Sequence, residues 1–271
     1  MTYVIANLSG GKDSTAMVIR MIEKGEDLDE VVFCDTGMEF PVMYDHIARV
    51  KDHVEESGVR FVTLKADLSF RDLLLDYPIH SEKYGDYLGF GWPSIKKRWC
   101  TKHLKTRLMD RHRKALRESG EDGIVTCTGL AADEAKRIEK PQNIMDRHPL
   151  AEWGWTEDMA LGYCYGKGFD WYDPAVGKGL YEIFDRTSCW ICPLSNLEYL
   201  RRLRRYYPDL WLEIGRLETR VREQRLCEGN ENVGSWSYTL RYTWADLEAR
   251  FAHEDDSDSS QTSLTTFGGS A

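Results

Sequence analysis

Apolar and polar positions divide the first half of the chain into short strands and longer helices. Residues 3–8 form an apolar run that ends before two glycines, which predicts a buried strand. Residues 13–24 carry apolar side chains at helical spacing and stop at Gly25, which predicts a helix. Further strands are predicted at residues 31–34, 60–64 and 124–128, and a second helix at residues 41–57. Strands that alternate with helices predict βαβ units, and therefore a Rossmann-like, doubly wound parallel sheet of the α/β class.

From residue 69 onward the pattern is less regular. Glycines and a proline make residues 69–98 a predicted loop, which we expect to act as a mobile cover. Residues 195–223 are helical with an interruption at Pro208, and they predict a small C-terminal helical appendage. Residues 253–271 are mostly Ser, Thr, Asp and Gly, which predicts a disordered tail. The expected organisation is an α/β domain at residues 1–193, a helical appendage at residues 194–252 and the tail.

The composition bounds the class of protein. The chain has 271 residues, of which 42% are hydrophobic, which suits one α/β domain with an appendage. No apolar run approaches the roughly 20 residues that a membrane helix needs, and Met1 is not followed by a basic segment or a signal-cleavage pattern. The sequence therefore predicts a cytoplasmic protein with no membrane partner. Its seven cysteines are an odd number, so they do not predict a disulfide framework.

Charge is distributed unevenly along the chain. Lysine and arginine number 36 against 45 aspartates and glutamates, and the net charge of −9 argues against strong non-specific binding to nucleic acid. Basic residues nevertheless gather between residues 96 and 113 and at a second cluster, which consists of Arg201, Arg202, Arg204 and Arg205. These clusters leave a local anion-binding face as an open alternative.

A glycine-rich run, Ser9-Gly10-Gly11-Lys12-Asp13-Ser14, lies between the first predicted strand and the first predicted helix; we call it the phosphate loop. Glycines let the backbone approach a phosphate, and a helix N-terminus offers unpaired N–H groups and a partial positive charge. The hydroxyls of Ser9 and Ser14 can donate to phosphate oxygens, and Lys12 supplies positive charge. The spacing is not that of a Walker loop. The run predicts a phosphate site, and the alternative is a plain glycine turn into a capped helix.

The same run resembles the PP-loop of the adenine nucleotide alpha-hydrolase-like superfamily. Within that superfamily the chain is most similar to the phosphoadenosine phosphosulfate (PAPS) reductase family, over roughly residues 1–215. That family is in turn similar to ATP sulfurylase small subunits and to the sulfurtransferase of Dnd-type DNA phosphorothioation. The resemblance implies that ATP or PAPS binds at the phosphate loop with Mg²⁺. It also implies catalytic roles for Lys12 and Asp13.

Two more motifs follow predicted strands. Asp35 and Thr36 belong to a segment that resembles the family's Asp-Thr-Gly motif, so we expect them to line the nucleotide site, with Asp35 on a ribose hydroxyl or Mg²⁺. Gly129 and Arg137 lie in a segment that resembles the pattern Gly-x-Arg-x-x-Glu-x-x-Arg. The expected roles are close backbone approach at Gly129 and a catalytic phosphate or sulfate clamp at Arg137. Ala131 stands where many members have Arg. A local turn and a solvated helix start are the respective alternatives.

A basic segment, residues 98–105, resembles the family's Cys-Thr-x-x-Leu-Lys motif. Lys102 and Lys105 are candidates to neutralise phosphates, and a solvated basic helix face is the alternative. Residues 148–153 resemble the family's Pro-Leu-x-x-Trp segment, to which we assign a structural role.

The cysteines suggest a metal centre. Related enzymes hold a 4Fe-4S cluster with cysteines at two of these places, and the resemblance implies Cys100, Cys189 and Cys192 as ligands. Cys164 is our candidate for the fourth ligand, and Cys227 is the second choice. Four thiolates also suit Zn²⁺, and a metal-free protein stays open. The remaining thiols, Cys34 and Cys127, are predicted to be core residues.

The C-terminal region bears on the reaction. Thioredoxin-dependent PAPS reductases carry a catalytic cysteine in a Glu-Cys-Gly-x-His segment near the end, which this sequence lacks. The resemblance therefore favours ATP-dependent sulfur transfer from a sulfur donor. One alternative is a sulfonucleotide reductase acting on PAPS or adenosine phosphosulfate (APS) with a thiol reductant. Another is a non-catalytic nucleotide-binding module in a DNA-modification or defence system, for which a run at residues 261–267 resembling a sliding-clamp peptide is the weak support.

Overall fold

A computed structural model describes residues 2–139, 145–187, 189–227, 237–239 and 241–266. The chain divides into two compact units. The first unit consists of Met1–Phe70 and Cys100–Trp190, and the second of Arg71–Trp99 and Ile191–Ala271. Residues 71–99 therefore belong with the C-terminal part of the chain, whereas our boundary at residue 193 assigned them to the α/β domain.

The first unit is built on a five-stranded parallel sheet with the strand order β3-β2-β1-β6-β7. Its strands are β1 (Val4–Leu8), β2 (Glu30–Asp35), β3 (Arg60–Lys65), β6 (Val125–Thr128) and β7 (Asp146–Arg147). The chain adds strands in one direction from β1 to β3 and then in the other from β6 to β7, so the predicted doubly wound, Rossmann-like topology is confirmed. All carboxyl ends meet at one edge, where ligands of such sheets bind.

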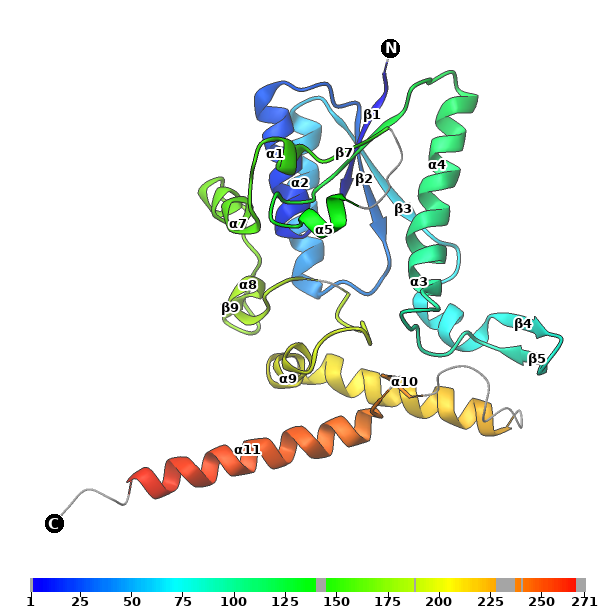
Figure 1. Cartoon of the computed structure of the whole chain (residues 1–271), viewed down its shortest axis with the longest axis vertical. Helices are drawn as coiled ribbons and strands as arrows, with labels where there is room; N and C mark the ends of the chain where they lie inside the picture. Colours follow the sequence, from blue (N-terminus) through cyan, green and yellow to red (C-terminus); the bar gives the residue numbers. More distant parts are fainter. Residues whose placement is uncertain (1, 140–144, 188, 228–236, 240, 267–271) are drawn as a thin grey trace. The chain divides into compact units, whose positions relative to one another are not determined.

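Helices cover both faces of this sheet (Figure 1). The helices of the first unit are α1 (Lys12–Lys24), α2 (Pro41–Glu56), α3 (Trp99–Thr101), the π-helical turn η2 (Lys102–Thr106), α4 (Arg107–Glu118), α5 (Ala135–Ile138), α6 (Pro149–Glu152), α7 (Glu157–Gly166) and α8 (Leu180–Ile183). The unit also contains a small hairpin of β8 (Tyr172–Asp173) and β9 (Lys178–Gly179). Helices α1 and α2 lie on one face and α4 on the other.

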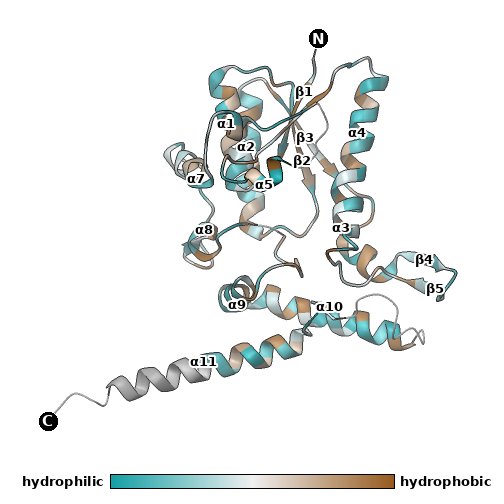
Figure 2. Ribbon diagram, viewed as in Figure 1, coloured by the Kyte–Doolittle hydropathy of each residue, from teal (hydrophilic) through white to brown (hydrophobic). Residues whose placement is uncertain are grey.

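Burial follows the alternation of side chains along the strands. Ile5 and Val32 point to the α4 face, where they pack with Met109 and Leu116 of that helix. Figure 2 shows alternating hydrophilic and hydrophobic bands along α4, as expected for a helix that lies on a sheet. Gly25 ends α1 in the left-handed conformation, with a φ of 62°, and its N–H bonds to the carbonyl of Ile22. The predicted end of this helix is therefore confirmed.

The second unit contains the segment that we predicted to be a loop. Its elements are η1 (Asp72–Asp76), a hairpin of β4 (Pro78–Ser81) and β5 (Gly85–Leu88), and the helices α9 (Leu197–Tyr206), α10 (Pro208–Cys227) and α11 (Trp244–Thr266). The loop prediction is wrong for residues 72–88. The predicted start of the tail, residue 253, falls inside α11.

Side chains of helix α10 hold the hairpin by donating hydrogen bonds to its backbone carbonyls. The guanidinium of Arg225, which is only 2% exposed, donates to the carbonyls of Leu88 and Gly89 at 2.6 Å. Gln224 donates to the carbonyls of Leu75 and Leu88 at 2.8 and 3.2 Å. The segment thus depends on side chains more than 130 positions away along the chain, which explains why no local pattern revealed it.

Two arginines of the α9 cluster are paired with acidic residues of α11. Arg204 bonds to the carboxylate of Glu248 at 3.0–3.1 Å and to Asp255. Arg201 bonds to Glu254 of the same helix, α11. A carboxylate that already accepts from an arginine competes with any incoming anion. Arg201 and Arg204 therefore belong to an interhelical ion-pair network, and these two residues give little support to an anion-binding face.

Replacement of Glu248 by Gln is expected to lower the free energy of unfolding by about 1 kcal/mol, because the charge-assisted bonds from Arg204 are weakened while an oxygen stays for Trp211. Chemical denaturation measures the change. Glu223→Gln, an exposed carboxylate on α10, is the matched control and should change the value by less than about 0.5 kcal/mol. Equal effects of the two changes would refute the prediction.

Candidate functional site

The phosphate loop joins β1 to α1 at the carboxyl edge of the sheet. Its serines bond to each other: the N–H of Ser9 donates to Oγ of Ser14 at 3.1 Å, and the two hydroxyl oxygens are 3.0 Å apart. Gly10 has a φ of 79°, and a Cβ there would lie 3.0 Å from side-chain atoms of Ile47 and Met43. The loop thus needs glycine at this position both for its backbone conformation and for its packing on α2.

Side chains from residues 164–181 hold the backbone of this loop. The indole N–H of Trp171 donates to the carbonyl of Gly10 at 2.8 Å. The N–H of Lys12 donates to the phenol oxygen of Tyr181 at 2.7 Å, and the thiol of Cys164 donates to the carbonyl of Lys12 at 3.5 Å. No motif of the sequence analysis pointed to these roles.

Gly129 follows β6 and contacts the loop directly. A Cβ at this position would lie 2.8 Å from the carbonyl carbon of Asp13 and 2.8 Å from the nitrogen of Ser14. No real side chain tolerates such a distance to backbone atoms. The sequence predicted glycine for close approach to a nucleotide, and the structure shows close approach to the phosphate loop itself.

Acidic residues surround the lysine of the loop. The side chain of Lys12 is only 5% exposed, and its ammonium pairs with the carboxylate of Glu157 and with that of Asp13, the latter at 3.4 Å. Glu157 begins α7, and its N–H donates to the carboxylate of Asp133 at 3.2 and 3.3 Å. Two of the three predicted catalytic residues, Lys12 and Asp13, therefore pair at the sheet edge, together with a carboxylate that the sequence did not single out.

Burial and neighbouring charge shift the protonation equilibria here. Burial raises the pKa of Asp13 to about 6; Lys12 opposes this shift, and the carboxylates of Glu157 and Glu134 add to it. Burial would lower the pKa of Lys12, but its bonds to Glu157 and Asp13 outweigh this effect and raise it. Lys12 is therefore held in its charged form, whereas Asp13 titrates closer to neutral pH than an ordinary carboxyl group does.

A pH-dependent stability follows for Asp13. The folded protein binds a proton at this carboxyl near pH 6, whereas the unfolded chain binds it only near the ordinary value of 3.8. The contribution of Asp13 to the free energy of unfolding should therefore increase by about 1 kcal/mol as the pH falls from 7.5 to 5. Denaturation of the protein and of Asp13→Asn across this range measures it, and the exposed Asp45→Asn is the control. A constant difference between protein and Asp13→Asn would contradict the prediction.

Asp35 and Thr36 follow β2 and make local contacts. The carboxylate of Asp35 accepts from the N–H of Gly37 at 2.8 Å and from the hydroxyl of Tyr44 at 3.1 Å, and it lies 3.2 Å from the ammonium of Lys65. The hydroxyl of Thr36 is buried and donates to Glu39 at 3.0 Å. These contacts are those of the turn that we considered as an alternative, and the roles of both residues toward a nucleotide stay predictions.

Arg137 lies on α5 and has an exposed side chain. Its guanidinium pairs with Glu134, one turn earlier. The other carboxylate oxygen of Glu134 accepts from the N–H of Ala131 at 3.3 Å. Glu134 thus orders the start of this short helix, and the clamp role of Arg137 stays a prediction.

Cys189 packs on the turn after β2. Its thiol donates to the carboxylate of Glu39 at 3.5 Å and lies 3.6 Å from the hydroxyl of Thr36. The next residue, Trp190, donates its N–H to the carbonyl of Met38 at 3.0 Å. The end of the first unit is therefore fixed beside the carboxyl edge of the sheet.

Three cysteines act on one ammonium group, that of Lys105 in η2. Burial would lower the pKa of Lys105, but Cys189, Glu39, Cys34 and Cys100 outweigh this effect and raise it. We call Cys34, Cys100 and Cys189 the thiol cluster. We predicted Cys34 to be a core residue, and it does pack against the hydrophobic core, although it is only half-buried at the end of β2. Cys34 is the last residue of the predicted strand at residues 31–34, and the apolar pattern of that strand does not show that this residue lies at the ligand-binding edge of the sheet.

The predicted set of four metal ligands does not fit the structure. In the described parts of the chain, no group of three or more His, Cys, Asp or Glu side chains is arranged to hold a metal ion. Cys164 is fully buried at the phosphate loop, where burial raises its pKa to about 12 and disfavours the thiolate that a metal needs. The assignment of Cys164 as fourth ligand is therefore wrong.

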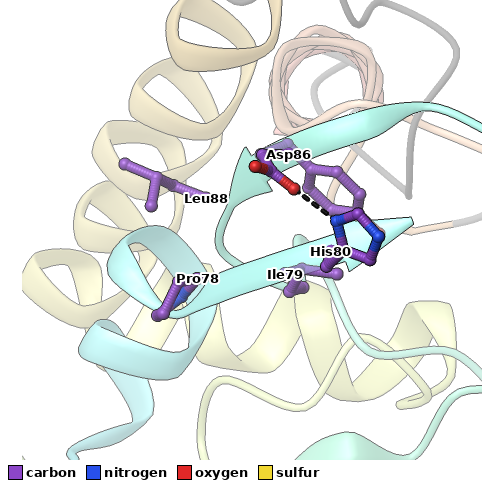
Figure 3. Close-up of a pocket in the computed structure, with 6 residues that line it drawn as sticks. Pro78, Ile79, His80, Asp86 and Leu88 are labelled. Carbon is purple, nitrogen blue, oxygen red and sulfur yellow. Dashed lines mark hydrogen bonds and ion pairs between the residues drawn. The ribbon is translucent and has the colours of Figure 1, made fainter. Parts of the chain in front are cut away.

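A cavity of about 510 Å³ lies on the hairpin of the second unit (Figure 3). It is lined by Pro78, Ile79, His80, Asp86, Tyr87 and Leu88. His80 and Asp86 bond across its mouth at 2.6 Å, and both side chains are exposed. None of the lining residues belongs to a nucleotide motif, so this cavity is not the predicted site.

Comparison with known families decides the relationship of the chain. A model of the phosphoadenosine phosphosulfate reductase domain matches residues 3–202. The chain belongs to the PAPS reductase family. This membership confirms the resemblance carried by the phosphate loop and its neighbouring motifs. It places the chain in a family of enzymes that act on sulfonucleotides and related adenine nucleotides.

Individual relatives add little about the reaction. The uncharacterized protein MJ0066 of Methanocaldococcus jannaschii is 26% identical over 250 residues, which cover 87% of this chain and 45% of that protein. The uncharacterized protein MJ0973 of the same organism is 26% identical over 223 residues, covering 77% and 46%. This PAPS reductase family member thus spans less than half the length of these curated relatives. A solved structure, the phosphate complex of PAPS reductase from Candida auris, is 19% identical with a TM-score of 0.43 and covers 62% of this chain and 74% of that chain.

The structure adds one finding about membranes. Within the described residues, no helix combines the length and the apolar character that a membrane span requires.

Proposed function

We propose that the protein activates a substrate with ATP at the phosphate loop and transfers sulfur to it. The observation that carries the proposal is the proximity of two chemistries in one unit. The loop places a buried lysine and helix N–H groups at the carboxyl end of β1. The thiol cluster lies around Lys105 at the end of the neighbouring strand, β2.

The loop supports the first half of this reaction. An acceptor oxygen that attacks the α-phosphorus of ATP expels pyrophosphate, whose negative charge needs fixed donors. The N–H groups at the start of α1 and the ammonium of Lys12 are such donors. Mg²⁺ would enter with the phosphates, and Asp35 is predicted to bind either this ion or a ribose hydroxyl. The group that carries the acceptor oxygen is the substrate to be found.

The thiol cluster supports the second half. The outer sulfur of a persulfide on one cysteine can displace AMP from the activated substrate, so that the carbon–oxygen bond breaks as the carbon–sulfur bond forms. A second thiol of the cluster then cleaves the sulfur–sulfur bond and releases the product, and an external thiol reductant reduces the disulfide that is left. Lys105 provides a positive charge beside Cys100 and Cys189, which favours the anionic sulfur that such a step requires. The sulfur itself must come from an external donor.

Nucleotide binding and product analysis test the proposal together. Calorimetry should detect ATP binding, and incubation with ATP, Mg²⁺, a persulfide donor and candidate acceptors should release pyrophosphate. Cys100→Ser and Cys189→Ser should stop sulfur incorporation but leave ATP binding intact, whereas Cys227→Ser, an exposed cysteine of the second unit, should change neither. A protein that binds no ATP would sink the proposal.

A sulfonucleotide reductase is the second candidate. Family membership favours it, because the domain model is that of PAPS reductase. It predicts release of sulfite from PAPS or APS with a thiol reductant and no pyrophosphate.

The predicted iron–sulfur cluster has its own measurement. Iron content and the visible spectrum of protein purified without oxygen would reveal a 4Fe-4S cluster, and zinc content would reveal the alternative. The proposed sulfur-transfer step uses neither. The clamp-like run at residues 261–267 lies outside the side chains that the structure describes, so a DNA or sliding-clamp partner stays a prediction.

A further inference from the structure

Both donors that Lys12 offers to a phosphate are already engaged by other residues. The ammonium of Lys12 pairs with the carboxylate of Glu157, and its N–H donates to the phenol oxygen of Tyr181 at 2.7 Å. One acceptor is anionic and the other is a neutral oxygen. Together they present oxygen atoms to the loop where a nucleotide would present its phosphate oxygens.

Both acceptors come from one stretch of the chain, and this stretch packs on the loop. Glu157 is the first residue of α7, the helix that packs along α1. Tyr181 is supported by Trp171, whose ring meets it edge-on at 4.8 Å between centroids, and by the hydroxyl of Thr187 at 3.0 Å. Tyr181 is thus held by its own neighbours, and Glu157 is placed beside the loop by the packing of α7 on α1 and by the bond of its N–H to Asp133.

The need for these acceptors follows from burial. An ammonium that is 5% exposed is costly without an opposing charge, and a buried N–H is costly without an acceptor. A bound polyphosphate would satisfy both groups in their place. The Glu157 carboxylate opposes this binding, because it repels the incoming polyphosphate and competes with it for the ammonium, which also pairs with Asp13.

We propose that Glu157 and Tyr181 are internal substitutes for phosphate oxygens, which the polyphosphate of a nucleotide displaces when it binds at the loop. This inference rests on the proposed function for the identity of the natural ligand. Its consequence is that Glu157 weakens polyphosphate binding. Part of the binding free energy of the polyphosphate is used to break the ion pair between Glu157 and Lys12. Adenosine carries no phosphate, so its affinity does not depend on that pair.

Glu157→Gln tests the charged half. It should tighten binding of inorganic pyrophosphate and of ATP by about tenfold in calorimetry, because charge-assisted bonds of this kind are worth more than neutral ones. Adenosine binding should not change. Asp158→Asn is the matched control: it removes one negative charge from the next position of the same helix, on an exposed side chain, and should have less than a twofold effect.

Tyr181→Phe tests the neutral half. Hydrogen exchange resolved to single amides should show faster exchange at Lys12 in the ligand-free variant, because its N–H has lost its acceptor. Pyrophosphate should restore the protection. Exchange that is unchanged by the substitution, or that pyrophosphate does not slow, would overturn the role of Tyr181.

The outcomes separate this inference from the proposed function. If the unmodified protein binds ATP but Glu157→Gln binds ATP and pyrophosphate no more tightly than Asp158→Asn does, the inference fails and the function stands. If ATP does not bind but Glu157→Gln binds pyrophosphate more tightly than the unmodified protein, the function fails and the inference stands. If pyrophosphate binds to no variant, the inference fails.

Discussion

Replacement of Gly129 by Ala is expected to reduce binding of ATP, or of PAPS, by at least about 100-fold. The new methyl group would lie 2.8 Å from backbone atoms of Asp13 and Ser14. These atoms belong to the first turn of α1, so relief of the clash moves the N–H groups that bind phosphate. A displacement of about 1 Å in a binding site is enough for a loss of this size.

The control for this substitution is Gly162→Ala. Gly162 lies inside α7, and a Cβ there meets no atom within 4 Å. Alanine is preferred to glycine within a helix, so this variant should be slightly more stable and should bind nucleotide normally. Calorimetric titration of both variants decides the matter. Binding by Gly129→Ala within threefold of the unmodified protein would show that the loop tolerates the displacement.

Replacement of Lys12 by Met is expected to lower nucleotide affinity by about 100-fold as well. Methionine keeps most of the length and the apolar stem but removes the ammonium that would face the phosphates. A charge-assisted hydrogen bond is worth about 1.5–3 kcal/mol, and the carboxylates of Asp13 and Glu157 are left to repel the incoming anion.

Lys51→Met is the control for this loss. Lys51 is an exposed lysine of α2 that pairs with Glu55, so its removal changes net charge equally without touching the phosphate loop. Affinity for ATP should stay within twofold of the unmodified value in this variant. Equal losses in the two variants would mean that overall charge, rather than the position of Lys12, governs binding.

The core of the first unit could be predicted from the sequence because its signals are local. Apolar runs of four to six residues marked β1, β2 and β3, and glycines marked where the intervening helices end. The hairpin of β4 and β5 gave no such signal, since its strands have four residues each and include polar positions such as His80 and Asp86. What orders it is Arg225, which lies in a distant helix.

The candidate site likewise combines features with a local sequence signal and contacts between residues that are distant in the sequence. The glycines, serines and lysine of the phosphate loop are adjacent in sequence, so their chemistry could be inferred. Trp171 and Tyr181 bond to that loop across 161 and 169 positions, which only the folded chain can reveal. Cys164 shows the reverse error: the need for a fourth thiolate made it a candidate metal ligand, whereas the folded chain buries it with its thiol bonded to the carbonyl of Lys12.

The division of the chain into two units has a consequence for experiments on its parts. The polypeptide passes from one unit to the other after Phe70, after Trp99 and again after Trp190, so three covalent connections link them. A fragment that ends at residue 193 would leave the hairpin without α10, and one proteolytic cut cannot release either unit. Cys100 directly follows one crossing, and Cys189 lies one residue before the last residue of the first unit. The rates at which these two thiols react with an alkylating reagent therefore report on the exposure of the chain at two of its three connections.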